Sequence, residues 1–181
     1  MPEMRILSEM IKSTALVGLQ GSPDKPRVIL TESQAPDSSA TISALPADAL
    51  VIRVDAFRSP DDVFNGAKGE CKRADYVIIS ARKRCILYIE LKRTKDNWNQ
   101  IVKQLMGAKC FVKYCQEIGK AFWNAGDFLN GYEHRFISIA HTSLSKRPTR
   151  IKNKAPVHSS PERALKVDWP KNLQFNQLAG V

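Results

Sequence analysis

The sequence predicts an α/β protein with a mixed central sheet, and three observations carry that prediction. Two apolar runs rich in Ile, Val and Tyr, Tyr76–Ser80 and Cys85–Leu91, flank the basic loop Ala81–Arg84, which is the pattern of a hairpin of two buried strands. From about residue 97 to residue 118, apolar residues recur every three or four positions, which predicts a long amphipathic helix. The apolar run Arg135–His141 then predicts a further strand that joins the same sheet.

Composition limits the class of protein. The chain has 181 residues, of which 43% are hydrophobic and 25% charged, as expected for one soluble globular domain spanning residues 1–181. A net charge of +10 favours a polyanionic partner, with nucleic acid ahead of an anionic membrane surface; a basic surface kept for solubility is the alternative. The four cysteines lack zinc-site spacing, and no apolar run is long enough for a signal peptide or a membrane span. We therefore expect a cytoplasmic protein that contacts no membrane.

The N-terminal part of the chain predicts one helix and two strands. Apolar residues at helical spacing predict a helix over Met4–Leu16. The apolar runs Arg27–Thr31 and Ala49–Phe57 predict strands, and the imperfect alternation of the second indicates a strand covered on both faces. Glu32–Ala40 is polar and contains a proline, which predicts a loop. Phe64–Lys72 contains two glycines and predicts a flexible approach to the hairpin.

The segments after the hairpin predict helix ends and an edge strand. Asp96 or Asn97 is suited to the N-cap of the long helix, and Gly119 is suited to its C-terminus. Ala121–Gly131 predicts a loop or a short helix. Leu165–Trp169 predicts a last strand at the edge of the sheet.

The register of the hairpin brings like charges together. With Ser80 paired to Cys85 across the loop, antiparallel pairing places Asp75 opposite Glu90. Two carboxylates at this spacing repel unless a cation or a proton lies between them. Lys92 projects from the same face because it lies two residues beyond Glu90.

This arrangement of residues resembles the motif of the PD-(D/E)xK nuclease superfamily. The motif is an Asp at a strand start, a hairpin, and Glu-x-Lys at the end of the next strand, here Asp75 and Glu90-Leu91-Lys92; the usual proline before the Asp is replaced by Ala74. The resemblance covers about Val51–His141 and implies a restriction-endonuclease-like core, with a mixed sheet of four to five strands flanked by helices in the order αβββαβ. It also implies a metal-dependent nuclease that hydrolyses phosphodiester bonds, with DNA favoured over RNA, and leaves a 5′-phosphate and a 3′-hydroxyl.

The resemblance also implies a cofactor and roles for individual residues. Mg²⁺, with Mn²⁺ as a substitute, would be held by the carboxylates of Asp75 and Glu90 and by the carbonyl of Leu91, because hard cations prefer oxygen ligands. Lys92 would orient the attacking water and stabilise developing negative charge.

Five further residues are candidates of lower rank, each with a structural alternative. Gln104 resembles the glutamine that orients a water or a phosphate in several nuclease lineages; the alternative is a partly exposed helix glutamine. Glu70 is a further candidate metal ligand, or else a loop glutamate paired with nearby basic residues. Glu9, by analogy an extra ligand, is more typical of a solvated helix face. Asp55 is more typical of a turn, and His141 of a structural strand end.

Basic residues gather in the segment Ser145–Lys154, which contains no acidic residue and predicts a loop. We expect its side chains to contact nucleic-acid phosphates, with a solvated loop as the alternative: Lys146, Arg147, Arg150, Lys152 and Lys154. The long helix adds Lys103, Lys109 and Lys113.

Two other functions remain open from the sequence. The first is a nucleic-acid-binding module without chemistry, and the second is an effector subunit that acts only as a homodimer or with a partner protein. A purely structural reading is that Asp75 pairs with Arg73 or Lys92 and that no metal binds.

Overall fold

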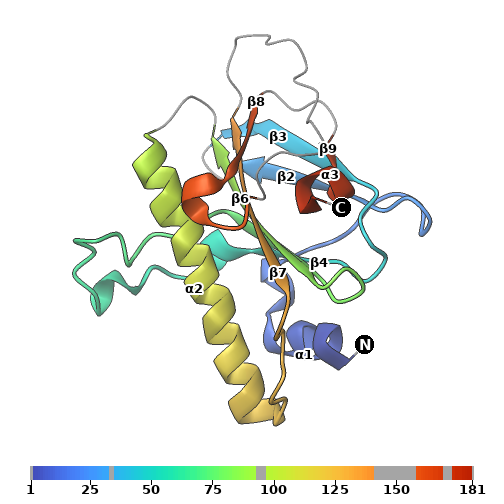
Figure 1. Cartoon of the computed structure of the whole chain (residues 1–181), viewed down its shortest axis with the longest axis horizontal. Helices are drawn as coiled ribbons and strands as arrows, with labels where there is room; N and C mark the ends of the chain where they lie inside the picture. The colour runs from blue at the N-terminus through green and yellow to red at the C-terminus, as the bar shows by residue number, and fades with distance from the viewer. Residues whose placement is uncertain (1, 33–34, 93–96, 141–157, 169–172, 181) are drawn as a thin grey trace.

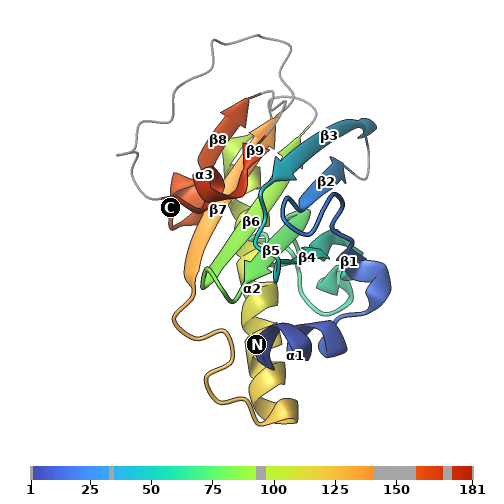
Figure 2. The ribbon, with the colours of Figure 1, turned by 90° about the vertical axis from the view of Figure 1, so that its right-hand side faces the viewer.

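The chain forms three layers in the computed structural model, which describes residues 2–32, 35–92, 97–140, 158–168 and 173–180. A six-stranded sheet lies in the middle (Figures 1 and 2). Helices α1 (Pro2–Met10) and α2 (Trp98–Trp123) cover one face. A three-stranded sheet and the short helix α3 (Phe175–Ala179) cover the other. The prediction of an α/β protein with a mixed sheet is therefore confirmed.

The central sheet has the strand order β1-β4-β5-β6-β7-β8. The strands are β1 (Leu16–Val17), β4 (Leu50–Arg53), β5 (Tyr76–Ser80), β6 (Cys85–Lys92), β7 (Glu133–Ala140) and β8 (Leu165–Asp168). Pairing is antiparallel from β1 through β6 and parallel between β6, β7 and β8. The predicted strands after α2 are confirmed, with β7 directly beside β6 and β8 at the edge. The expected four to five strands become six, because the two-residue β1 pairs with β4 and β8 completes the other edge.

The hairpin of β5 and β6 has the register expected from the sequence. Ser80 pairs with Cys85 and Tyr76 pairs with Ile89, and residues 81–84 form the turn between them. Every residue of β5 is buried, as is every residue of β6 except its last. The next pair outward in this register is Asp75 and Glu90.

The second sheet corrects one loop prediction. Strands β2 (Arg27–Glu32) and β3 (Ala35–Ser43) form an antiparallel hairpin, and β9 (Leu173–Gln174) pairs with β3. Most of Glu32–Ala40 is therefore strand, and its loop prediction is wrong. The segment is polar and poor in β-branched residues, but pairing with β2 satisfies its backbone, and Ala40 is buried against the central sheet.

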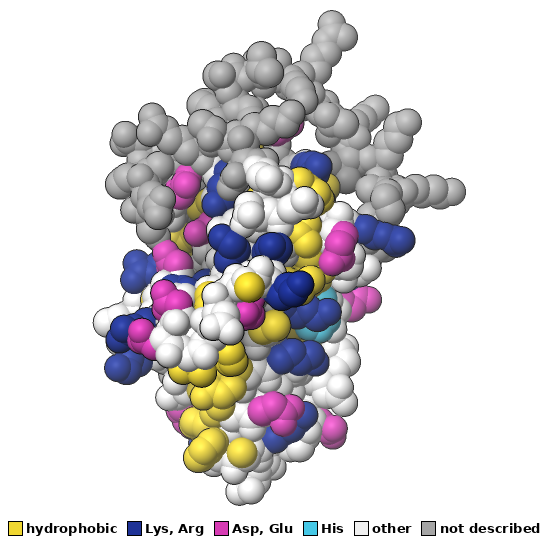
Figure 3. Space-filling model, turned by 90° about the vertical axis from the view of Figure 1, so that its left-hand side faces the viewer, with side chains coloured by type: hydrophobic (Ala, Val, Ile, Leu, Met, Phe, Trp, Pro, Cys, Tyr) yellow, Lys and Arg dark blue, Asp and Glu magenta, His cyan; other side chains and the backbone are white. Residues whose placement is uncertain are grey.

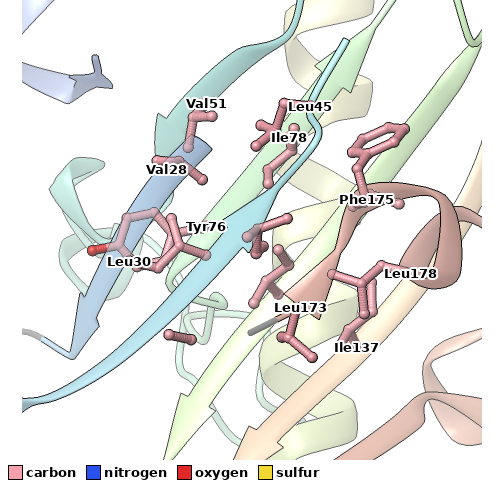
Figure 4. Close-up of a cluster of buried hydrophobic side chains, with 14 of the residues drawn as sticks. Val28, Leu30, Leu45, Val51, Tyr76, Ile78, Ile137, Leu173, Phe175 and Leu178 are labelled. Carbon is pink, nitrogen blue, oxygen red and sulfur yellow. The ribbon is translucent and has the colours of Figure 1, made fainter. Parts of the chain in front are cut away.

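Apolar side chains join the two sheets in one continuous core, drawn in Figure 4. On β2, Val28 and Leu30 point toward the central sheet, and Phe175 and Leu178 of α3 pack into the same core. A second core lies between the central sheet and helices α1 and α2, and it includes Tyr88, Leu105 and Phe136.

Helix α2 begins as predicted and ends later. The side chain of Asn97 caps its N-terminus by accepting a hydrogen bond from the backbone N–H of Asn99 at 3.0 Å. Gly119 does not end the helix. A Cβ there would lie 2.4 Å from Cδ1 of Phe128, so this glycine admits an aromatic ring, and the helix continues to Trp123 with Asn124 in the left-handed C-cap position.

Other boundaries shift by a few residues. The first helix ends at Met10 and a 3₁₀ turn follows at Ser13–Ala15, while β4 gives way at Val54–Ala56 to another 3₁₀ turn. Within the described ranges, no helix has the length and apolar character needed to cross a membrane. His141 and the basic segment Ser145–Lys154 lie outside the described residues.

Candidate active site

Asp75, Glu90 and Lys92 lie on the α2-facing side of the hairpin. Along β5 and β6, alternate residues such as Val77 and Tyr88 pack into the core beneath α2, and the three charged residues share their parity. The sequence therefore places three charges on a helix-covered face at the end of the hairpin opposite its turn, where the apolar pattern stops.

Asp75 is held by its own backbone and side chain. Its carbonyl accepts a hydrogen bond from the backbone N–H of Val54 at 2.7 Å, and its Oδ2 accepts one from the N–H of Leu91 at 2.7 Å. Burial raises the pKa of the Asp75 carboxyl to about 6; the Leu91 hydrogen bond and Lys92 oppose this shift, while the nearby charges of Asp55 and Glu32 add to it.

Glu90 is the most enclosed charged group of the site, with 0% of its surface exposed. Burial, and then repulsion from Asp75, raises the pKa of its carboxyl to about 8, against the lowering effect of Lys92. The ammonium Nζ of Lys92 lies 2.8 Å from Oε1. Neither carboxylate oxygen of Glu90 has a hydrogen-bond donor of good geometry among the described residues, although the backbone N–H of Asp75 helps to lower the pKa of the carboxyl. An incompletely satisfied buried carboxylate is costly, and a proton or a cation would offset that cost.

These residues border a cavity of about 270 Å³. Asp75, Leu91 and Lys92 line it from the hairpin, and Gln104 lines it from α2. The structure thus brings together four of the predicted site residues, with Glu90 buried directly behind them.

The close approach of α2 to the hairpin depends on a glycine. A Cβ built on Gly107 would lie 1.7 Å from the carbonyl oxygen of Lys72 and 3.2 Å from Cα of Arg73. Only glycine lets the helix lie this close to the segment that leads into Asp75. Gln104, one turn earlier on α2, is thereby brought to the cavity.

The cavity also contains one acidic residue that the sequence did not propose for the site, Glu32. Glu32 ends β2 and reaches the site because Tyr76 Oη donates a hydrogen bond to the carbonyl of Thr31 at 2.7 Å. Its Oε2 is buried with no donor among the described residues. The signal in the sequence is an acidic residue in phase with buried Val28 and Leu30, but the polar segment Glu32–Ala40 predicts a loop at this position.

Asp55 and Arg73 complete the electrostatics of the cavity. Asp55 lies in the 3₁₀ turn after β4, as its turn-like context predicted, and it also lines the cavity. Arg53 Nε lies 3.4 Å from Asp55 Oδ1, and Arg73 Nη2 donates to the Asp55 carbonyl at 3.3 Å. The lining of the cavity therefore contains both carboxylates and basic side chains.

Two candidate residues lie away from the cavity. Glu70 is exposed and accepts a hydrogen bond from the backbone N–H of Lys68 at 2.8 Å, so it caps its own loop rather than facing Asp75. Glu9 bonds Arg5 and Trp123 Nε1 at the C-terminal end of α2. That end lies about 28 Å from Gln104 at 1.5 Å per helical residue.

The residues present fit Mg²⁺ better than a metal enclosed entirely by protein. Within the described ranges, no three His, Cys, Asp or Glu side chains cluster closely enough to hold an ion by themselves. Mg²⁺ commonly takes one or two carboxylates and fills its other positions with water and substrate phosphate oxygens. Asp75 and Glu90 supply that pair of carboxylates.

No protein-family model, curated protein or solved structure matches the chain.

Proposed function

We propose that the protein is a Mg²⁺-dependent nuclease of the PD-(D/E)xK type that hydrolyses phosphodiester bonds of nucleic acid, with DNA favoured over RNA. The observation that carries the proposal is the convergence of Asp75, Glu90 and Lys92 at one end of a buried hairpin, where an acidic pair stays buried beside a cavity. The element order α1, β4-β5-β6, α2, β7 supports a restriction-endonuclease-like core.

Each residue has a task in this proposal. Asp75 and Glu90, with the Leu91 carbonyl, would hold the metal, which supplies charge neutralisation and a lower pKa of bound water. Lys92 would hold the attacking water and face the negative charge that develops on the phosphate. Gln104 would orient a water or a phosphate oxygen from the helix side.

Isosteric and truncating substitutions test the proposal. Asp75→Asn keeps an oxygen for the Leu91 N–H but removes a charge, and Lys92→Ala removes the ammonium. Each is expected to lower Mg²⁺-dependent cleavage by about a hundredfold or more. Lys83→Ala is the matched control because Lys83 is exposed in the turn of the same hairpin. The measurement is cleavage of linear, circular and branched DNA and of RNA with Mg²⁺ or Mn²⁺, with circular dichroism to confirm folding.

Unchanged cleavage in both site variants would overturn the proposal. A wild-type protein that binds nucleic acid, cleaves none of the substrates and takes up no Mg²⁺ in calorimetry would instead be a binding module that uses this fold without chemistry.

A further inference from the structure

The segment between Asp55 and Arg73 forms a projecting loop beside the cavity. Asp55 lines the cavity where the loop begins, and Cys71, Lys72 and Arg73 line it where the loop returns. Ser59 Oγ donates to the Cys71 carbonyl at 3.2 Å and closes the base of the loop. Figure 1 shows this segment, coloured cyan to green, extending past α2 at the left edge of the molecule.

The loop exposes three large apolar side chains. Phe57 is 42% exposed, Val63 78% and Phe64 53%. A 3₁₀ turn at Pro60–Asp62 presents the last two, because the N–H groups of Val63 and Phe64 both donate to the Pro60 carbonyl. Phe57 is supported from α2 by Phe111, with ring centroids 5.5 Å apart. The loop thus offers two aromatic rings to solvent, and both of its ends line the cavity that contains Asp75.

Charge divides the loop into two zones. The tip carries Asp61 and Asp62, the second paired with Arg58 at 2.9 Å. The returning arm carries three basic residues, Lys68, Lys72 and Arg73, and one acidic residue, Glu70. The side chain of Lys103, on α2, covers Gly69 on this arm, since a Cβ there would lie 2.7 Å from its Cδ. A phosphate backbone would be repelled at the acidic tip and attracted at the basic arm. The tip is therefore better suited to contact the uncharged bases of a nucleic acid than its phosphates.

We propose that residues 57–73 bind unpaired nucleobases by stacking on Phe57 and Phe64, so that the substrate is a single strand or the unpaired part of a branched or frayed duplex. The proposal rests on the proposed nuclease function, whose substrate class it narrows. Aromatic rings stack on any base whose face is accessible. In an intact duplex those faces are covered by neighbouring bases.

Binding measured without cleavage tests this inference. Fluorescence anisotropy of a labelled single strand and of a blunt duplex is recorded in the Lys92→Ala background, without metal. Phe64→Ala is expected to weaken single-strand binding by about fivefold to a hundredfold, the range for loss of one stacked base, and to leave duplex binding nearly unchanged. Phe122→Ala is the matched control: Phe122 is 78% exposed at the far end of α2. Phe64→Trp should restore binding, since it keeps an aromatic face.

Two results would overturn the inference. One is equal single-strand affinity in the Phe64→Ala and Phe122→Ala variants. The other is a dimer in light scattering that Phe64→Ala converts to a monomer without a change in nucleic-acid binding, which would assign the loop to protein association. Both results leave the nuclease proposal standing if Lys92→Ala abolishes cleavage. Conversely, Phe64-dependent single-strand binding by a wild type that cleaves nothing would support stacking and reject the nuclease.

Discussion

At the scale of single residues, the site combines groups that oppose folding. Glu90 is fully enclosed and lies beside Asp75, and the pKa of each carboxyl is raised chiefly by burial. Lys92 offsets part of this cost through its contact with Glu90 at 2.8 Å. Keeping two acids in such a place is costly for stability unless they bind a cation, which is the pattern of a functional site.

This cost predicts a pH-dependent gain in stability for Glu90→Gln. The folded-state pKa of about 8 lies above the ordinary value of 4.5, so the stabilising effect of the proton is complete below about pH 4.5 and is lost as the pH rises through 8. Without metal, the variant should therefore be more stable than the wild type near pH 8, with a free energy of unfolding higher by at least about 1.4 kcal/mol, the equivalent of one pKa unit. The two should converge near pH 4.

Thermal unfolding followed by circular dichroism in the presence of a chelator measures this difference. Glu117→Gln, at an exposed position of α2, serves as the control. A wild type that is more stable than Glu90→Gln at pH 8 would show that Glu90 is charged and well satisfied without metal.

At the scale of elements, the contact between α2 and the segment leading into β5 positions the site. Gly107 allows the backbones of the helix and of Lys72–Arg73 to lie against each other, and Gln104 is brought to the cavity by the same contact. Helix propensity alone would favour alanine over glycine at this position by about 1 kcal/mol. Helix propensity therefore predicts that Gly107→Ala stabilises the protein, whereas packing predicts that it destabilises the protein.

Gly107→Ala is expected to destabilise the protein by roughly 1–3 kcal/mol, since the added Cβ forces α2 and the Lys72 carbonyl apart. It should also lower cleavage at temperatures where the variant stays folded, because Gln104 moves away from Asp75. Urea unfolding and cleavage assays measure the two effects. Gly126→Ala is the control, because a Cβ there meets nothing within 4 Å. Stabilisation by Gly107→Ala would mean that helix propensity outweighs the close contact.

At the scale of the whole molecule, a basic protein surrounds a cavity of mixed charge. The net charge is +10, and in Figure 3 Lys and Arg side chains, with Asp and Glu among them, spread across the middle of the face above a hydrophobic patch. Under the proposed function, the basic surface would attract a polyanion, while the carboxylates of the cavity would repel a phosphate placed against them unless a metal ion lay between. This contrast favours nucleic-acid binding that is metal-independent and cleavage that requires a metal.

Binding to a single strand should therefore fall steeply with salt. Four neutralised phosphates give a slope of log affinity against log salt of about −2.8, or roughly a fiftyfold loss of affinity between about 50 and 200 mM salt.

Lys103→Gln should make the slope shallower by about 0.7 if it removes one phosphate contact, whereas Lys25→Gln, at an exposed position remote from α2 in sequence, should not. Phe64→Ala should weaken binding with the slope retained, since stacking releases no counterions. Anisotropy titrations at several salt concentrations measure these slopes, and a salt-independent affinity would exclude phosphate contacts as its source.

Much of the hairpin could be predicted because its determinants are local. The lengths of two apolar runs and a four-residue turn set the register that places Asp75 beside Glu90, and alternation puts Lys92 on the same face. The start of α2 at Asn97 follows from a short-range capping contact. The sequence does not predict Glu32 as a site residue, because its position depends on a hydrogen bond between Tyr76 and Thr31, which are far apart in the chain.

The sequence by itself therefore determined the two strands of the β5–β6 hairpin, their register and the charges at their end, since each follows from side-chain periodicity within a few residues. The tertiary structure decided what surrounds those charges. Gly119 reads locally as a helix end, yet the packed ring of Phe128 explains its presence in mid-helix. Likewise, Glu32, Asp55 and Gln104 meet at one cavity because separate elements pack together, and packing between distant segments leaves no periodic trace in any one of them.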